Sequence, residues 1–340
     1  MKKILALILT LTLVIGLFAG CSQTPSAPVS GNDNSQTGGD NAGGKKLVFG
    51  LSLFYRTDEY YMDIENSMKK EAEKLGIELL VQDANTDLSK QIQQIEDFIT
   101  KKVDAIIMSP CDPVGSQACV EAAKKAGIPI FTYDGIMEDN TDVAGYTTCD
   151  FYSDGYKTGQ WAKEYIEKNL DGKAKVAILD YPASPIVCGG RADGFEAAVK
   201  ELEGVEVVAR QDGKGSRTDG MTVMENILTA NSNDVDVVFA INYESGAGAA
   251  AAIEAAKADT IVTCVAWSKE GLEKMEADDP IMKAYMLGVP SDHTKILQAA
   301  KDVCEGKTID KEVTYEYIVV DHDTLDEKVD WKAIIDMRNQ

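Results

Sequence analysis

The chain has 340 residues, of which 44% are hydrophobic and 26% are charged, and its formal net charge is −22. A surface this acidic repels phosphate backbones and anionic lipid head groups, which argues against nucleic acid as a partner. Two histidines, no Cys-x-x-Cys pair and no calcium-loop spacing give no basis for a metal site, so we predict none.

The beginning of the chain has the layout of a secretory signal. Lys2 and Lys3 precede an apolar run from Ile4 to Val14, and residues 17–21 read LFAGC. These five residues resemble a bacterial lipobox, in which cleavage leaves Cys21 as the lipidated first residue. We therefore predict a signal peptide at 1–20 and a lipid anchor on Cys21. The alternative is a membrane-spanning anchor, but the apolar run is short for a span.

The segment 21–45 is rich in Ser, Gly, Asn, Thr, Pro and Gln. Such a composition cannot bury enough apolar surface to order itself, so we predict a disordered tether. The rest of the chain is too long for the commonest single domain and suits two. From residue 46 onward, short apolar strands alternate with amphipathic helices. This alternation predicts βαβ units and parallel sheets, which is an α/β fold.

Two series of strands are predicted in chain order. The first series comprises 47–53, 77–81, 105–108 and 128–133, with helices between them that end at Gly76 and Gly127. The second series begins after 143–146 with a helix and comprises the strands 175–179, 205–209, 235–240, 260–266 and 281–287. A helix at 294–304 and a strand at 315–320 come too late to continue one series. The chain is therefore predicted to cross again between two lobes.

The stretch 128–135, read as IPIFTYDG, indicates where a ligand would bind. Its apolar residues suit a strand that is buried on both faces. Asp134 comes where this strand ends, and the carboxyl ends of parallel strands are where ligands bind in α/β sheets. Gly135 would let a ligand approach the backbone. The alternative is that Asp134 only caps a turn.

Several segments together resemble the type I periplasmic sugar-binding proteins, and the ribose-binding branch most. The resemblance covers about residues 46–320 and is carried by 47–76, 103–112 (VDAIIMSPCD), 128–135, 191–195 (RADGF) and 236–242 (DVVFAIN). It implies two doubly wound parallel-sheet lobes joined by a three-segment hinge, and a ligand held in the cleft. It also implies no enzymatic activity and delivery of the ligand to an ABC importer.

With this resemblance the lobes are expected at 46–147 plus 289–313 and at 148–288 plus 314–340. We expect a monomer that contacts a sugar or polyol and an ABC permease, and that touches the membrane only through its anchor. Its location would be extracytoplasmic, at a Gram-positive surface or in a periplasm. A ligand-presenting sensor component for a membrane kinase or chemoreceptor is an alternative function. A two-carboxylate glycosidase is a further one, although no other catalytic signature accompanies the carboxylates.

The resemblance also implies which residues contact the ligand. Carried over residue by residue, they are Asp58, Tyr60, Tyr61, Asp134, Asp150, Arg191, Asn242 and Trp267. Carboxylates, an amide and a guanidinium suit the hydroxyl edge of a sugar, because charged and bidentate hydrogen bonds are the strong ones. Aromatic faces suit its C–H surface. No cofactor is expected, since the Gly- and Ala-rich stretch 246–256 matches neither a Walker loop nor G-x-G-x-x-G and is predicted to be a helix.

Some of these residues also have structural explanations. Tyr60 and Tyr61 stand at a helix start, where they could pack as a staple. Arg191 could form a surface ion pair on its own helix, which is the common case for an arginine at such a position. Asn242 could cap the helix that follows it, and Trp267 could belong to the core.

Three positions depart from the ribose-binding pattern. Gly135 replaces an arginine, Ser268 replaces an aspartate, and Gly288 replaces a glutamine. Three polar contacts to ribose are therefore missing, and the ligand is expected to be a different sugar or polyol. The six cysteines beyond Cys21 show no tight framework spacing, so we expect mostly buried free thiols.

Overall fold

The computed structural model describes residues 46–337. The predicted signal peptide, the lipidated Cys21 and the tether lie outside the described residues. No helix within 46–337 is both long and apolar enough to cross a membrane.

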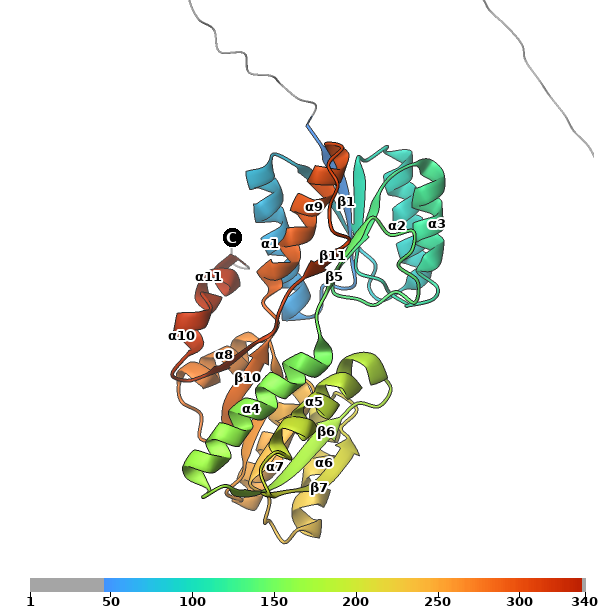
Figure 1. Cartoon of the computed structure of the whole chain (residues 1–340). Coiled ribbons are helices and arrows are strands. Elements are labelled where there is room, and N and C mark those ends of the chain that lie inside the picture. Colours follow the sequence, from blue (N-terminus) through green and yellow to red (C-terminus); the bar gives the residue numbers. More distant parts are fainter. Residues whose placement is uncertain (1–45, 338–340) are drawn as a thin grey trace, which may run out of the picture. The chain divides into compact units, whose positions relative to one another are not determined.

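The first lobe is built on a six-stranded parallel sheet with the order β11-β5-β4-β3-β1-β2. Its strands are β1 (Val48–Leu53), β2 (Glu78–Asp83), β3 (Ala105–Met108), β4 (Ile130–Thr132), β5 (Gly145–Thr148) and β11 (Glu312–Thr314). Its helices are α1 (Glu59–Leu75), α2 (Leu88–Thr100), α3 (Gln117–Ala126) and α9 (Lys295–Cys304). Figure 1 shows α1 and α9 side by side on one side of this sheet and α2 and α3 on the other.

The second lobe contains a six-stranded sheet with the order β12-β10-β9-β8-β6-β7. Its strands are β6 (Lys173–Asp180), β7 (Gly204–Asp212), β8 (Val237–Ala240), β9 (Ile261–Ala266), β10 (Met282–Leu287) and β12 (Ile318–Asp321). All neighbours pair in parallel except β12, which is antiparallel to β10. The α/β fold class with two lobes is therefore confirmed.

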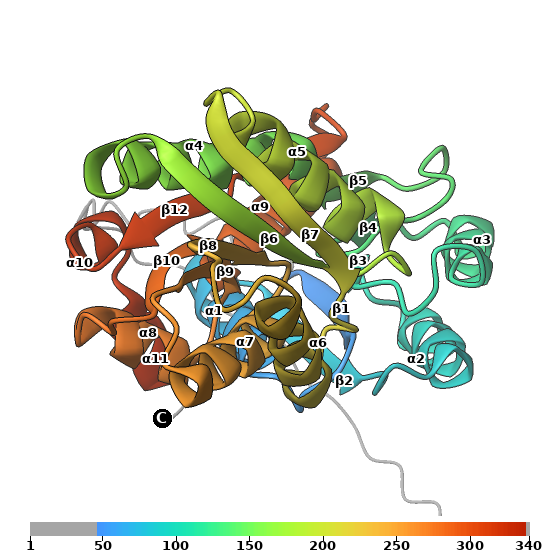
Figure 2. The same ribbon diagram turned by 90° about the horizontal axis from the view of Figure 1, so that it is seen from below.

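Helices cover both faces of the second sheet, as Figure 2 shows, with α4 and α5 on one side and α6 and α7 on the other. These helices and their neighbours are α4 (Phe151–Asn169), α5 (Gly190–Val199), α6 (Arg217–Ala230), α7 (Tyr243–Ala256), α8 (Lys269–Glu276), α10 (Leu325–Lys328) and α11 (Trp331–Asp336). Two short helices, η1 (Pro185–Gly189) and η2 (Pro290–Thr294), precede α5 and α9. The helix predicted in the stretch 246–256 is confirmed as part of α7.

The central strands explain why the sheet could be recognised from the sequence. All four residues of β3 and of β8 are buried, because helices cover both faces of a parallel sheet. The predicted helix ends at Gly76 and Gly127 are confirmed, since both glycines adopt the left-handed conformation with φ near +70°. Each glycine donates its N–H to two carbonyls of the preceding turn.

The chain crosses between the lobes three times: between β5 and α4, between β10 and η2, and between β11 and β12 (Figure 1). The strand predicted at 315–320 is wrong in its first half. Residues 315–317 form the third crossing, and only the part from Ile318 pairs with β10. The apolar and aromatic character of this segment reflects burial between the lobes rather than a place in a sheet.

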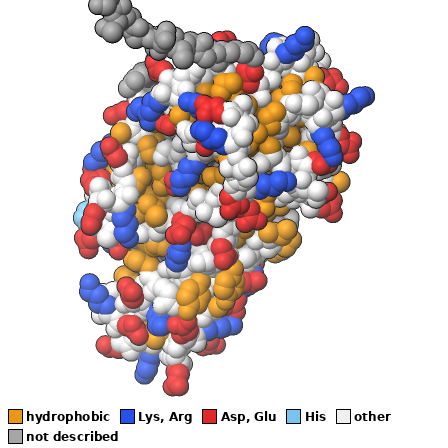
Figure 3. Space-filling view, turned by 45° about the horizontal axis from the view of Figure 1, so that its top comes forward, with side chains coloured by type: hydrophobic (Ala, Val, Ile, Leu, Met, Phe, Trp, Pro, Cys, Tyr) orange, Lys and Arg blue, Asp and Glu red, His pale blue; other side chains and the backbone are white. Residues whose placement is uncertain are grey.

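The described cysteines are all free. Cys119 and Cys264 are buried, whereas Cys111, Cys149, Cys188 and Cys304 are half-buried, so full burial holds for fewer thiols than predicted. On the face seen in Figure 3, basic and acidic side chains alternate, and no basic patch gathers there.

Candidate functional site

The candidate site is centred on Asp134, which follows β4 at the carboxyl end of the first sheet. Its backbone adopts a φ of +45°, which turns the chain sharply away from the strand. The turn is fixed by the Asp134 N–H, which donates to Thr147 Oγ1 at 3.1 Å, and by the Asp134 carbonyl, which accepts from Ser109 Oγ at 3.4 Å. A Cβ at Gly135 would lie 2.6 Å from Pro110 Cδ, so this position has no room for a side chain.

Tyrosines surround the Asp134 carboxyl group, whose side chain is only 13% exposed. The pKa of Asp134 is raised to about 6, because burial and the nearby Asp58 raise it by more than hydrogen bonds from Tyr61 and Tyr60 and the charge of Arg191 lower it. Asp134 is therefore a carboxyl group that lacks most of the solvation that its charge needs.

His293, on η2 at the second crossing, lies beside Asp134. Its Nε2 is 3.5 Å from Asp134 Oδ1 and 2.9 Å from the Tyr60 hydroxyl, and its Nδ1 is 3.3 Å from Thr147 Oγ1. The ring is fully buried, and burial lowers the pKa of His293 to about 3. The imidazole is therefore neutral near pH 7 and supplies hydrogen bonds to this group without a positive charge.

Arg191 comes from α5 of the second lobe and is only 7% exposed. Its guanidinium carbon lies 4.5 Å from the centre of the Tyr317 ring and 5.3 Å from that of Phe151. The Arg191 Nε has no hydrogen-bond partner within the described structure. The alternative of a surface ion pair on its own helix is wrong, because Arg191 is buried and the acids of α5, Asp193 and Glu196, pair with Arg210 of β7 instead.

Close packing of helices explains why Arg191 is buried. A Cβ at Gly155 would overlap the Arg191 carbonyl, and a Cβ at Gly194 would overlap the Tyr152 carbonyl. These two glycines let α4 and α5 approach until their backbones touch. Arg191 then lies beneath the start of α4, where its charge reaches Asp134 in the other lobe.

Sequence reasoning missed part of the site. The second and third crossings supply His293, Tyr315 and Tyr317, and the ring of Tyr315 lies 4.6 Å from that of His293. A Cβ at Gly288 would be 2.5 Å from Tyr317 Cε1, so the Tyr317 ring occupies the space beside Gly288. This explains why position 288 is a glycine and not the glutamine of the ribose-binding pattern. The sequence feature that could have revealed these residues was the pair Tyr315 and Tyr317, in a segment predicted to cross again between the lobes.

Asp154 on α4 is a second buried carboxyl group that sequence reasoning missed, with 2% exposure. Its Oδ2 has no hydrogen-bond partner among the described residues. Burial raises the pKa of Asp154 to about 6, whereas the charges of Lys157 and Arg191 lower it. Arg191 is therefore electrostatically linked to a buried acid in each lobe.

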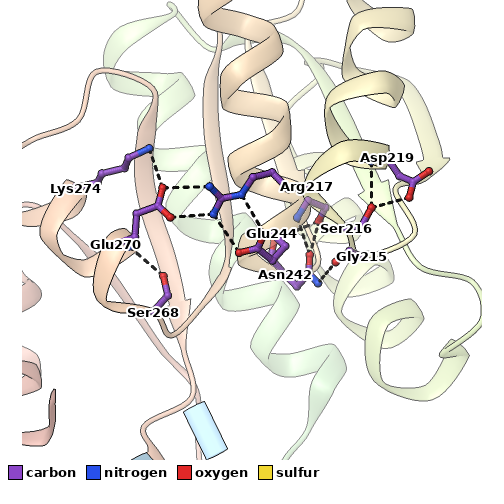
Figure 4. Close-up of polar contacts among 11 residues, drawn as sticks. Gly215, Ser216, Arg217, Asp219, Asn242, Glu244, Ser268, Glu270 and Lys274 are labelled. Carbon is purple, nitrogen blue, oxygen red and sulfur yellow. Dashed lines mark hydrogen bonds and ion pairs between the residues drawn. The ribbon is translucent and has the colours of Figure 1, made fainter. Parts of the chain in front are cut away.

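Three predicted site residues cap helices in this structure. The side chains of Asp58, Asp150 and Asn242 accept backbone N–H groups at the starts of α1, α4 and α7. Figure 4 shows that the Asn242 amide also donates to the Gly215 carbonyl, at 2.8 Å, next to the ion pairs of Arg217. Asn242 therefore caps α7, which the sequence analysis gave as the alternative to ligand contact.

Trp267 follows β9 and belongs to the core of the second lobe. Its indole Nε1–H donates to Asp63 Oδ2 in α1 of the first lobe, at 2.8 Å, and Asp63 is fully buried. Close by, the backbone N–H of Lys269 donates to Glu59 Oε2 at 2.6 Å. Trp267 thus forms part of the contact between the lobes, and its polar atom is already used there.

The structure therefore brings Asp58, Tyr60, Tyr61, Asp134 and Arg191 together. Asp150 and Asn242 instead cap α4 and α7, and the indole N–H of Trp267 is bonded to Asp63. Within 46–337 no cluster of His, Cys, Asp or Glu has the arrangement to hold a metal ion. A carboxyl group, a guanidinium and several aromatic rings drawn from both lobes can bind a small polar molecule by hydrogen bonds and stacking.

Comparison with known proteins identifies the family. Residues 49–308 match the periplasmic binding protein domain. A ribose import binding protein of Bacillus subtilis is 31% identical over 316 residues, which cover 92% of this chain and 97% of that protein. The chain belongs to the periplasmic binding protein family. The sequence resemblance to the type I sugar-binding proteins is thereby confirmed.

Two further relatives of this periplasmic binding protein have different named ligands. A fructose import binding protein of Bifidobacterium longum is 28% identical and covers 93% of this chain and 96% of its own length. An ABC transporter solute binding protein of Bacillus halodurans, solved with bound myo-inositol, superposes with a TM-score of 0.70 at 26% identity. That superposition covers 85% of this chain and 98% of the other. The fold therefore accepts ligands of more than one class.

Proposed function

We propose that this chain is a lipid-anchored binding protein that captures a sugar or polyol between its two lobes and delivers it to an ABC importer. The observation that carries the proposal is that Asp134 in one lobe and Arg191 in the other line the same site. Both are buried, and the charge of Arg191 reaches Asp134. The relatives named for ribose and fructose import support the class of ligand.

The chemistry of the site suits a polyhydroxylated ligand. A carboxylate accepts hydrogen bonds from hydroxyl groups, and a guanidinium donates to them, so the two groups can hold adjacent hydroxyls. The Arg191 Nε is a buried donor without a partner, which a ligand oxygen would satisfy. Tyrosine rings can cover the C–H faces of a sugar.

Binding would proceed by closure of the hinge around the ligand. The three crossings let one lobe move against the other. The proposed lobes are 46–147 plus 289–313 and 148–288 plus 314–340, so the hydrogen bond from Trp267 to Asp63 joins the two lobes and is of the kind that closure forms, whereas Tyr60 and His293 contact each other within the first lobe. A monomer suffices for this mechanism.

A thermal-shift screen of the mature chain carrying Cys21→Ser tests the proposal. Pentoses, hexoses, furanoses, polyols and inositols are added, and binding raises the melting temperature because ligand binds only the folded state. We expect one class to stabilise the protein and Arg191→Lys to abolish most of the shift, since lysine lacks the planar fork. Arg210→Lys is the matched control, because Arg210 lies on β7 and pairs with Asp193 and Glu196 of α5. The absence of a shift across the whole panel would contradict the proposal.

A further inference from the structure

The balance of charge around the candidate site points to a narrower class of ligand. Asp134 has no lysine or arginine within ion-pair distance among residues 46–337. Its nearest nitrogen is His293 Nε2 at 3.5 Å, and that imidazole is neutral because burial lowers its pKa to about 3. The packing of Gly135 against Pro110 also excludes a basic side chain from the next position.

Further acids surround the same region. Asp58 lies near enough to Asp134 to raise its pKa, and Asp154 is buried on the far side of Arg191 with one oxygen unpaired. Asp154 has a partly exposed lysine beside it, since Lys157 Nζ lies 3.7 Å from Asp154 Oδ1. The buried cation of the site is Arg191, whose guanidinium lies over the rings of Tyr317 and Phe151. Carboxyl groups therefore outnumber buried cations in the site.

Aromatic rings form one wall beside Asp134. Tyr55 and Tyr61 have ring centres 4.8 Å apart, and Phe54 lies 5.1 Å from Tyr55 and 5.5 Å from Tyr61. Tyr60 packs edge-on against Tyr61 at 5.7 Å. The faces of such rings carry negative electrostatic potential and attract cations, most strongly where water is excluded.

We infer that the ligand carries a protonated amine beside its hydroxyl groups, as in an amino sugar or an amino polyol. The inference rests on the proposed function and assigns the ammonium group to Asp134 and the aromatic rings next to it. Arg191 is a cation and a hydrogen-bond donor, so it binds the hydroxyl or ring oxygens of the ligand. A neutral hydroxyl at Asp134 would leave the buried carboxylate without a counter-charge, whereas an ammonium group would supply one.

Matched pairs of ligands test this inference by isothermal titration of the mature chain carrying Cys21→Ser. The pairs are D-glucosamine with D-glucose, D-galactosamine with D-galactose, D-mannosamine with D-mannose, and an inosamine with myo-inositol. In at least one pair we expect the amine to bind at least tenfold more tightly. Its N-acetyl derivative, which keeps the shape but loses the charge, should lose this advantage.

Variants locate the effect. Asp134→Asn should weaken binding of the amine at least tenfold more than it weakens binding of the neutral partner. Asp139→Asn, an exposed aspartate in the following loop, should change neither. A variant at Asp134 that weakens both partners equally would overturn the assignment of the ammonium group.

The dependence on pH gives a second readout. Asp134 loses its charge below about pH 6, so affinity for the amine should fall between pH 7.5 and pH 5. The groups that face it are Asp58 before α1, Tyr60 and Tyr61 on α1, Tyr55 in the preceding loop, His293 on η2 and Arg191 on α5. Affinity for a neutral sugar should vary much less over this range.

The outcomes separate the two proposals. If neutral sugars bind as tightly as their amines, the inference is wrong and the proposed function stands. If no member of any pair binds and the wider panel is also silent, the proposed function fails and the inference fails with it.

Discussion

At the scale of single residues, the charged side chains of the candidate site are buried rather than exposed. Arg191 is a clear case, because an arginine four residues before a phenylalanine on a helix normally points to solvent. Its burial depends on Gly155 of α4, and this contact between two helices cannot be read from the sequence pattern of either helix. The sequence could predict Asp134, since that residue ends an apolar strand, but it could not predict its neighbour His293.

His293 should make stability depend on pH. The folded protein keeps this imidazole neutral, with a pKa of about 3, whereas in the unfolded chain it binds a proton below about pH 6.5. The unfolded state then binds more protons, so this residue lowers the free energy of unfolding by about 1.4 kcal/mol for each pH unit below 6.5. The contribution of His293 is fully favourable only above that pH.

The variant His293→Gln isolates this effect. Urea denaturation of both proteins at pH 7.5 and pH 4.5 should show a smaller loss of stability for the variant, by about 3 kcal/mol. Asp134 and Asp154, whose pKa values are raised, act in the opposite direction, because they bind protons in the folded state as the pH falls through 6. Both proteins retain these two acids. Parallel changes in the two proteins would show that the folded imidazole is not held neutral.

At the scale of elements, the helices and strands follow from local patterns, and their ends follow from caps. Gly76 and Gly127 end helices where the sequence predicts it, because only a residue that tolerates positive φ fits there. The exception is the segment 315–317. Its tyrosines have the composition of a strand, but their partners are His293 at the second crossing and Arg191 on α5 of the second lobe. Composition alone cannot reveal such partners.

The contact between α4 and α5 should be sensitive to one added methyl group. Gly155→Ala would place a Cβ against the Arg191 carbonyl, so α5 must move or the helices must separate. We expect a loss of about 2 kcal/mol in the free energy of unfolding and weaker ligand binding, because Arg191 moves with its helix. Chemical denaturation and titration calorimetry measure the two effects.

Gly189→Ala is the matched control for this prediction. The nearest atom to a Cβ at Gly189 is 4.0 Å away, and the φ of −59° suits any residue. The change in stability should remain within about 0.5 kcal/mol. Equal effects of the two substitutions would show that helix propensity rather than packing between α4 and α5 decides the result.

At the scale of the whole molecule, hydrogen bonds between the lobes should set the balance between closed and open forms. Trp267→Phe keeps an aromatic ring but removes the donor to the buried Asp63. We expect the radius of gyration from X-ray scattering to increase without ligand and affinity to fall about fivefold to tenfold, in line with one lost hydrogen bond. The ligand is the strongest one from the thermal-shift screen.

Trp161→Phe is the control, because Trp161 donates to Asp321 within the second lobe at 3.0 Å. It should lower stability but leave the radius of gyration and the affinity unchanged. If both variants behave alike, the bond between Trp267 and Asp63 has no special part in closure.

The proposed anchor gives a prediction for the intact chain in cells. Cys21→Ser should remove the acyl label and move the protein from the membrane fraction to the soluble extracytoplasmic fraction, since no helix within 46–337 can span a bilayer. Fractionation with metabolic fatty-acid labelling measures both. Retention of the Cys21→Ser protein in the membrane would favour the uncleaved N-terminal anchor.

The order of the last two strands has a consequence for how the protein is made. β11 is an edge strand of the first sheet and β12 an edge strand of the second, and only residues 315–317 separate them. A chain leaving the ribosome therefore lacks one edge strand in each lobe until residues 312–321 have been made, after all the other strands of both sheets. The two sheets are thus completed almost together by one short segment, rather than one lobe after the other.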